Sequence, residues 1–185
     1  MTDWLIFAVL APILWGVSNV IDVGVRRHYV KSDIAMMWFL AMTRLPLIIV
    51  FLVLFGFEVP SYKDVILMLI GGIIWISPFF MYYKAIEFEE PSRVVLLMQM
   101  TPIFIMALAF FMLGEVLTLQ QVLAFVLLLI GGTIASVKTL NKKLHFSKAF
   151  ILILGATFLW GLSDVIFKKI EMNFESFFSA FTVYL

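Results

Sequence analysis

Long runs of apolar residues, separated by short polar connectors, dominate the pattern of this chain. A helix needs about 20 mainly apolar residues to cross the hydrocarbon core of a bilayer, and clusters of charges and helix breakers mark its ends. The pattern predicts six full spans and the apolar start of a seventh. They lie at residues 4–25, 34–55, 65–86, 93–113, 119–137, 149–167 and 174–185. The predicted fold class is therefore an all-α integral membrane protein.

Composition agrees with this pattern and excludes several function classes. The chain is 64% apolar and 14% charged, and its mean hydropathy is +1.11, values far from those of an ordinary soluble domain. Cysteine is absent, which excludes disulfides, thiolate nucleophiles and zinc–thiolate sites. Basic residues are concentrated in connectors rather than in a stripe suited to nucleic acid. The lipid bilayer is the expected partner, and nucleic acid is not.

The basic residues also predict an orientation. Nine lysines and arginines fall in the odd-numbered connectors and three in the even-numbered ones. The positive-inside rule then places the odd connectors in the cytoplasm and the N-terminus outside. The first run opens with Thr2 and Asp3 and has no basic leading segment or cleavage pattern before Arg26. We therefore predict a retained span, and the short connectors favour a prokaryotic inner (cell) membrane.

An internal duplication is the most informative feature of the sequence. Residues 13–21 read ILWGVSNVI and residues 158–166 read FLWGLSDVI, about 145 positions later. Five spans separate the two copies, and an odd number reverses direction, so the repeat is predicted to be inverted. We expect a first five-helix repeat at residues 1–140 and the start of a second, incomplete repeat at residues 146–185. Inverted halves that rock about a midplane site produce alternating access in several transporters.

The first span carries a polar stripe. Trp15, Asn19, Asp22 and Arg26 follow one another by four, three and four residues and share a helical face, with Ser18 beside them. Charged groups inside a membrane are costly and rarely face lipid. Asp22 is thus a candidate proton or substrate-amine site, with Asn19 and Trp15 lining the route. The alternative is an interfacial ion pair between Asp22 and Arg26.

The second copy places a carboxylate deeper in the membrane. Asp164 occupies the position of Asn19, about one turn deeper than Asp22 relative to the shared Trp-Gly pair that includes Trp160. A proton-coupled carrier needs a carboxyl group that is neutral on one side and ionised on the other, which makes Asp164 the better candidate. Lys168 lies four residues on, so an Asp164–Lys168 ion pair is the alternative interpretation.

The second span contains a further charge. Arg44 lies about ten residues into this span and precedes Pro46, whose ring removes a backbone donor. Its guanidinium could bind an anionic group or a carboxylate, or it could snorkel to the interface.

The third and fourth spans supply polar candidates of other kinds. Tyr82 and Tyr83 fit a substrate cage, although an interfacial aromatic belt is the commoner role. Gln99 and Thr101 precede Pro102 at a potential cavity, but a buried glutamine can also simply bond a neighbouring helix.

Several short motifs together resemble the EamA family of the drug/metabolite transporter superfamily. Each motif is weak alone, but their order and spacing cover nearly all of residues 1–140. They are Trp15-Gly16-x-Ser18-Asn19, Tyr83-Lys84-Ala85-Ile86, Pro91-Ser92-Arg93, Pro102-Ile103-Phe104, Gly114-Glu115-Val116-Leu117-Thr118 and Gly131-Gly132. The resemblance implies a carrier of ten helices in two inverted five-helix repeats around a central cavity. It also implies a structural cap or turn role for Glu115.

The predicted function is secondary transport, as an exporter or exchanger, of small organic metabolites or drugs by alternating access, without a cofactor. The candidate substrate-binding residues are Trp15, Asn19, Asp22, Arg44, Tyr82, Gln99, Thr101, Trp160 and Asp164. Two alternatives stay open: a non-transporting subunit or truncated half-carrier, which could act as a homo-oligomer, and a membrane-embedded lipid enzyme. The enzyme fits less well, because no Ser-His-Asp grouping or close carboxylate pair is evident.

Overall fold

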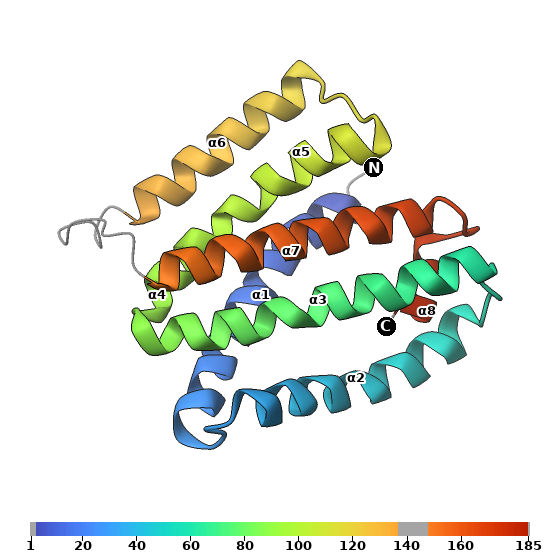
Figure 1. Cartoon of the computed structure of the whole chain (residues 1–185). Helices are drawn as coiled ribbons and strands as arrows, with labels where there is room; N and C mark the ends of the chain where they lie inside the picture. The colour runs from blue at the N-terminus through green and yellow to red at the C-terminus, as the bar shows by residue number, and fades with distance from the viewer. Residues whose placement is uncertain (1–2, 137–147, 185) are drawn as a thin grey trace. The chain divides into compact units, whose positions relative to one another are not determined.

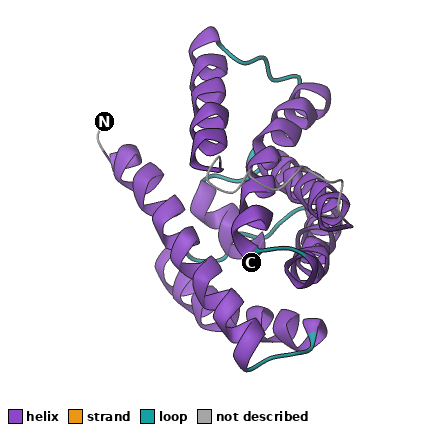
Figure 2. Ribbon diagram, turned by 90° about the vertical axis from the view of Figure 1, so that its left-hand side faces the viewer, coloured by secondary structure: helices purple, strands orange, loops and turns teal. Residues whose placement is uncertain are grey.

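The structure is a computed structural model that describes residues 3–136 and 148–184 (Figures 1 and 2). Within these ranges every element is helical. The elements are α1 (Asp3–His28), α2 (Asp33–Phe55), α3 (Tyr62–Phe88), α4 (Pro91–Leu97), a 3₁₀ turn (Met98–Met100), α5 (Thr101–Leu113), α6 (Leu119–Ser136), α7 (Lys148–Glu171) and α8 (Phe177–Tyr184). The all-α expectation is therefore confirmed for the described residues.

Five helical stretches in the described ranges are long and apolar enough to cross a membrane. These are Ala8–His28, Asp33–Phe55, Tyr62–Phe88, Arg93–Leu113 and Lys148–Glu171. The chain is thus a multi-pass membrane protein, as predicted. A helix also forms where the fifth span was predicted, but α6 is not one of the five candidates, so its crossing stays a prediction. The apolar start of a seventh span contains the short helix α8.

Two compact units divide the chain, Met1–Leu40 and Ala41–Leu185. The first unit contains α1 and the first residues of α2. Its connector is fixed by Arg26, whose guanidinium forms an ion pair with Asp33 and donates a hydrogen bond to the Val30 carbonyl oxygen at 3.2 Å. Arg26 is 9% exposed, so this basic side chain ties the end of α1 to the start of α2.

The core of the second unit forms around α7, which lies between α3 and α5 (Figure 1). Small residues let the helices approach closely. A Cβ atom on Gly161 would lie 3.2 Å from the Ile105 backbone nitrogen and 3.2 Å from the Phe104 Cβ. Ile153 and Ile170, on the same helix, are fully buried. The first helix of the second sequence copy is thus the central helix of this unit.

Three connectors lie at one end of the second unit, namely α2–α3, α5–α6 and α7–α8 (Figure 1). Gly114, at φ +69°, ends α5 in the left-handed conformation that glycine adopts without strain. Glu115 follows and forms an ion pair with Lys168 of α7 at 2.7 Å, in keeping with a turn role. The basic connector at residues 137–147, which contributes to the predicted orientation, lies outside the described residues.

Candidate functional site

A buried hydroxyl of the repeated motif links three helices. Ser163 of α7 is fully buried, and its Oγ donates to the Gly71 carbonyl oxygen of α3 at 3.2 Å. The same Oγ lies 2.8 Å from the Tyr184 hydroxyl of α8. A hydroxyl carries one proton, so Ser163 accepts from Tyr184 while it donates to Gly71. The chain of bonds therefore runs from α8 through α7 to α3.

The absence of a side chain at Gly71 makes this link possible. A Cβ atom there would lie 2.8 Å from the Tyr184 hydroxyl oxygen and 3.1 Å from its Cε2 atom. A Cβ atom at these distances would force the tyrosine ring to shift away from α3. Gly71 therefore lets the tyrosine ring lie directly against α3.

Arg44 lies at the centre of α2 and stacks on an aromatic ring. Its guanidinium carbon is 3.7 Å from the centroid of the Trp75 ring of α3. Such a contact is favourable, and more so where water is excluded. No carboxylate binds Arg44 among the described residues, so the ion-pair alternative is not formed there; binding of an anionic group and snorkelling to the interface stay predictions.

Asp164, too, has no salt-bridge partner within the described part of the chain. Lys168 binds Glu115 instead, so the Asp164–Lys168 pair that the spacing allowed is not formed. Asp164 is exposed on α7 and makes neither a hydrogen bond nor an ion pair with any described residue.

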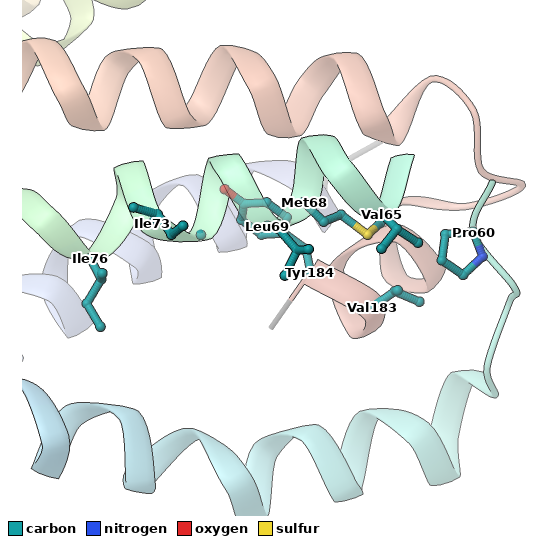
Figure 3. Close-up of a pocket in the computed structure, with 9 residues that line it drawn as sticks. Pro60, Val65, Met68, Leu69, Ile73, Ile76, Val183 and Tyr184 are labelled. Carbon is teal, nitrogen blue, oxygen red and sulfur yellow. The ribbon is translucent and has the colours of Figure 1, made fainter. Parts of the chain in front are cut away.

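The Tyr184 ring also forms part of the wall of an apolar pocket (Figure 3). The pocket has a volume of about 480 Å³ and is lined by α3, α8 and the end of the α2–α3 connector. Its lining residues are Pro60, Val65, Met68, Leu69, Gly72, Ile73, Ile76, Val183 and Tyr184. An apolar wall with few polar groups is typical of sites for small organic molecules.

A second, polar pocket of about 410 Å³ adjoins the α2–α3 and α7–α8 connectors. Glu58, Ser61, Asp64 and Asn173 are among its lining residues, and Pro60 lines both pockets. Pro60 of the α2–α3 connector is thus the residue common to both linings.

The aromatic residues around Trp160 form a buried cluster rather than a belt. Tyr82 is 2% exposed and Tyr83 is fully buried. The Trp160 ring lies 6.3 Å from Tyr82 and 5.4 Å from Phe79 between centroids. The belt interpretation of the two tyrosines is therefore wrong, because α7 covers this face of α3. Tyr82 and Trp160, two of the candidate residues, lie close together, and their role as substrate ligands stays a prediction.

The candidates in α1 belong to the first unit. Trp15 is 56% exposed, and Asn19 and Asp22 are partly exposed. Among the described residues Asp22 makes no hydrogen bond or ion pair. Since the ion-pair partner of Arg26 in the structure is Asp33, the alternative Asp22–Arg26 pair is not formed.

Gln99 and Thr101 lie apart from Gly71, Ser163 and Tyr184. Gln99 is exposed in the 3₁₀ turn. Thr101 donates to the Met98 carbonyl oxygen at 2.7 Å, a local bond within the turn. Neither residue lines either of the two pockets. Their role as substrate ligands stays a prediction.

Sequence reasoning did not select Ser163, Gly71, Trp75 or Tyr184 as site residues. A signal for Ser163 existed, because it recurs with Ser18 in the two copies of the motif. The Gly71-Gly72 pair also indicated a close approach of helices. Tyr184 offered no such signal, since a tyrosine in an apolar run is common at membrane interfaces.

Comparison with known protein families gives one clear result. The model of the EamA-like transporter family matches residues 2–137. No curated protein and no solved structure matches the chain. Since the matched segment covers well over half of the sequence, this chain belongs to the EamA-like transporter family.

Proposed function

We propose that the protein is a secondary transporter, an exporter or exchanger of small organic metabolites or drugs that works by alternating access. The observation that carries the proposal is the pair of charges in candidate spans. Arg44 is the central residue of α2, and Asp164 lies about two thirds of the way along α7. Neither has a charged partner among the described residues.

The cost of intramembrane charge supports this proposal. A charged side chain at the bilayer centre costs about 2.5 to 3.5 kcal/mol on insertion scales, so such residues face polar surroundings or water and commonly mark transport pathways. The contact with the Trp75 ring partly offsets the cost of the Arg44 charge. Asp164 makes no such contact. A water-accessible or substrate-filled cavity beside α7 would solvate it. We therefore assign Asp164 the role of the proton- or substrate-responsive carboxyl group.

The duplication supports a wider architecture of two inverted five-helix repeats, ten helices in all. In this proposal residues 1–140 form the first repeat and residues 146–185 begin the second. The face that α7 buries includes Trp160, Gly161 and Ser163, and α1 carries Trp15, Gly16 and Ser18 at the equivalent positions. Equivalent residues on two inverted helices would enclose one central site, between the first, third, fourth and sixth spans.

The proposal is tested by transport in proteoliposomes. Purified full-length protein is reconstituted, and uptake of radiolabelled amino acids, amines, nucleosides and sugars is measured with and without an imposed pH gradient. We expect saturable uptake of at least one compound. Asp164→Asn should abolish the response of that uptake to pH, because the amide cannot take up or release a proton.

Glu175→Gln is the matched control. Glu175 is exposed in the α7–α8 connector, so removing its charge should leave uptake and its pH response unchanged. Uptake that does not saturate and persists after the gradient is dissipated would contradict secondary transport. An unchanged pH response in Asp164→Asn would contradict the role of Asp164 alone.

A further inference from the structure

Arg44 brings a positive charge to the middle of two candidate spans. It is the central residue of α2, and its guanidinium lies over the ring of Trp75, which is the central residue of α3. A cation at this depth is costly unless polar groups, water or an anion face it. The charge of Arg44 therefore calls for a partner that the protein itself does not supply within the described residues.

The contact with Trp75 holds the guanidinium without neutralising it. The carbon at the centre of the guanidinium is 3.7 Å from the ring centroid, and an aromatic ring carries no net negative charge. Among the described residues, no oxygen or nitrogen accepts a hydrogen bond from Arg44. A guanidinium has five N–H donors in a fixed fork, which matches the two oxygens of a carboxylate. Arg44 is thus oriented and able to bind an anionic group.

The apolar pocket lies beside this cation. Trp75 precedes the lining residue Ile76 and lies one helical turn from Gly72, another lining residue, so the three share one side of α3. Pro60 and Ile76 lie at opposite ends of the labelled lining (Figure 3). Arg44 is therefore at the Ile76 end of the pocket, near the middle of α3, and the α2–α3 connector is at the other end.

Charge is distributed unequally between the two ends. Among the described residues that line the apolar pocket, none has an acidic side chain. The carboxylates of Glu58 and Asp64 line the neighbouring polar pocket, at the connector end that includes Pro60. An anionic group is repelled by these carboxylates and attracted by Arg44. A bound acid would thus point its carboxylate toward the middle of the membrane.

We propose that Arg44 and the apolar pocket together form a binding site for a small organic carboxylic acid with an apolar body. The carboxylate pairs with the guanidinium, and the apolar body lies along α3 against the pocket wall. The volume of about 480 Å³ is within the range of small-molecule sites, about 300–1,000 Å³. The acid supplies the counter-charge of Arg44, and burial of its apolar surface adds to the affinity.

Equilibrium binding of naphthoate tests this site. The full-length protein is reconstituted in phosphatidylcholine nanodiscs, and bound radiolabelled naphthoate is compared with bound naphthamide, a neutral probe of nearly the same shape. We expect saturable binding of the acid and weaker binding of the amide. Arg44→Gln should weaken binding of the acid about tenfold or more, because a hydrogen-bonded charge is lost, and leave binding of the amide unchanged.

Two further variants separate charge from shape. A Cβ atom at Gly72 meets no heavy atom within 4 Å, so Gly72→Leu places its side chain in the pocket and should weaken binding of the acid and the amide alike. Arg44→Lys keeps the charge but loses the fork. Its affinity for the acid should fall between those of the wild type and Arg44→Gln.

Lys84→Gln is the matched control. Lys84 is exposed on α3, and its amine lies 5.4 Å from the centroid of the Phe80 ring, which is also a cation–π contact. It does not line the apolar pocket, so this variant should bind the acid as the wild type does. Equal affinity of the acid for Arg44→Gln and the wild type would overturn the site, as would equal affinity of the wild type for the acid and the amide.

A lipid headgroup is the competing source of an anion. We expect unlabelled phenylacetate to displace naphthoate. Displacement by phosphatidylglycerol but not by phenylacetate would assign the site to a lipid and contradict the proposal. Because binding is measured without any movement across the membrane, its outcome is independent of the proposed transport. Thermal unfolding of each variant in detergent shows whether a loss of binding reflects the site rather than the fold.

Discussion

At the scale of single residues, the space at Gly71 and the hydroxyl of Ser163 decide how α8 meets α3. Gly71 leaves room for the Tyr184 ring, and Ser163 supplies the bonds that hold it there. The two effects are of different kinds, steric and polar, so they can be separated by substitution.

Gly71→Ala should destabilise the protein. The new methyl group would lie 2.8 Å from the Tyr184 hydroxyl oxygen, and overpacking of this kind costs about 1–3 kcal/mol. The adjacent Gly72→Ala is the control, because a Cβ atom there meets no heavy atom within 4 Å. Thermal unfolding in detergent should show a lowered midpoint for Gly71→Ala and an unchanged or raised one for Gly72→Ala. A larger loss for Gly72→Ala would contradict the assigned contact.

Ser163→Ala and Tyr184→Phe should be coupled. Each removes one partner of a buried hydrogen bond, and such bonds contribute about 0.5–1.5 kcal/mol net. Once Ser163 is replaced, the Tyr184 hydroxyl has lost its acceptor, so Tyr184→Phe should cost little more. A double-mutant cycle of unfolding free energies measures the coupling. Additive losses would show that the two hydroxyls do not depend on each other.

The sequence was informative about residues that break a pattern. Asp164 and Arg44 stand out as charges in apolar runs, and Trp160 stands out because it recurs. The partners of these residues were not predictable, since an i to i+4 spacing only permits a contact. Asp22 and Arg26 share a face, yet Arg26 binds Asp33 across the connector. Tertiary geometry, absent from local spacing, decides between such partners.

At the scale of helices, α7 is the element on which the second unit depends. It packs against both α3 and α5, and two of its glycines show how different these contacts are. At Gly161 the neighbours are backbone and Cβ atoms of α5, whereas at Gly155 the neighbour is the flexible end of Met81 on α3. The first contact is rigid and the second can adapt.

Gly161→Ala should therefore destabilise the protein more than Gly155→Ala. The Gly161 methyl would lie 3.2 Å from the Ile105 backbone nitrogen, which cannot move without shifting α5. The Gly155 methyl would lie 3.4 Å from the Met81 sulfur, an ordinary contact distance. We expect Gly161→Ala to lower the free energy of unfolding by about 1–3 kcal/mol, and Gly155→Ala to lower it by less. Equal midpoints in thermal unfolding would contradict close packing of α7 on α5.

Helix positions followed from the sequence, but helix packing did not. A run of 20 apolar residues in a membrane chain has one favourable conformation, because only a helix bonds every backbone group internally. Which face meets which neighbour is another matter, since a helix that is apolar all round has no preferred buried side. The burial of Tyr82 and Tyr83 illustrates this, as the same tyrosines would suit an interface equally well.

At the scale of the whole molecule, the alternation of connectors sets the topology. The α2–α3, α5–α6 and α7–α8 connectors lie at one end of the second unit, and these are the even-numbered connectors of the predicted topology. This grouping is what alternating directions of α3, α5 and α7 within the second unit require; that α1 and α7 cross in opposite directions, as an inverted repeat needs, stays a prediction.

Single-cysteine labelling of intact cells checks this topology. Exposed positions in the even connectors or in the adjoining helix turn, Lys63→Cys, Val116→Cys and Met172→Cys, should react with an impermeant maleimide added outside. Tyr29→Cys and Phe88→Cys, in an odd connector and at the helix end that borders one, should react only after the cells are permeabilised, as the positive-inside rule predicts. The reverse pattern would invert the orientation. Mixed accessibility among the three even positions would contradict the alternation itself.

The burial of Trp160 gives the protein an intrinsic optical probe. Its indole N–H is buried and bonds no described residue, and the ring is 7% exposed between α3 and α7. Excited indole emits at shorter wavelength when polar molecules cannot relax around it, and collisional quenchers need direct contact with the ring. Trp160 should therefore be shielded from acrylamide in the aqueous phase and from brominated acyl chains in the bilayer. Any rearrangement that separates α3 from α7 would end this shielding, so a variant that keeps Trp160 and replaces the other four of the five tryptophans can report that motion without an added label.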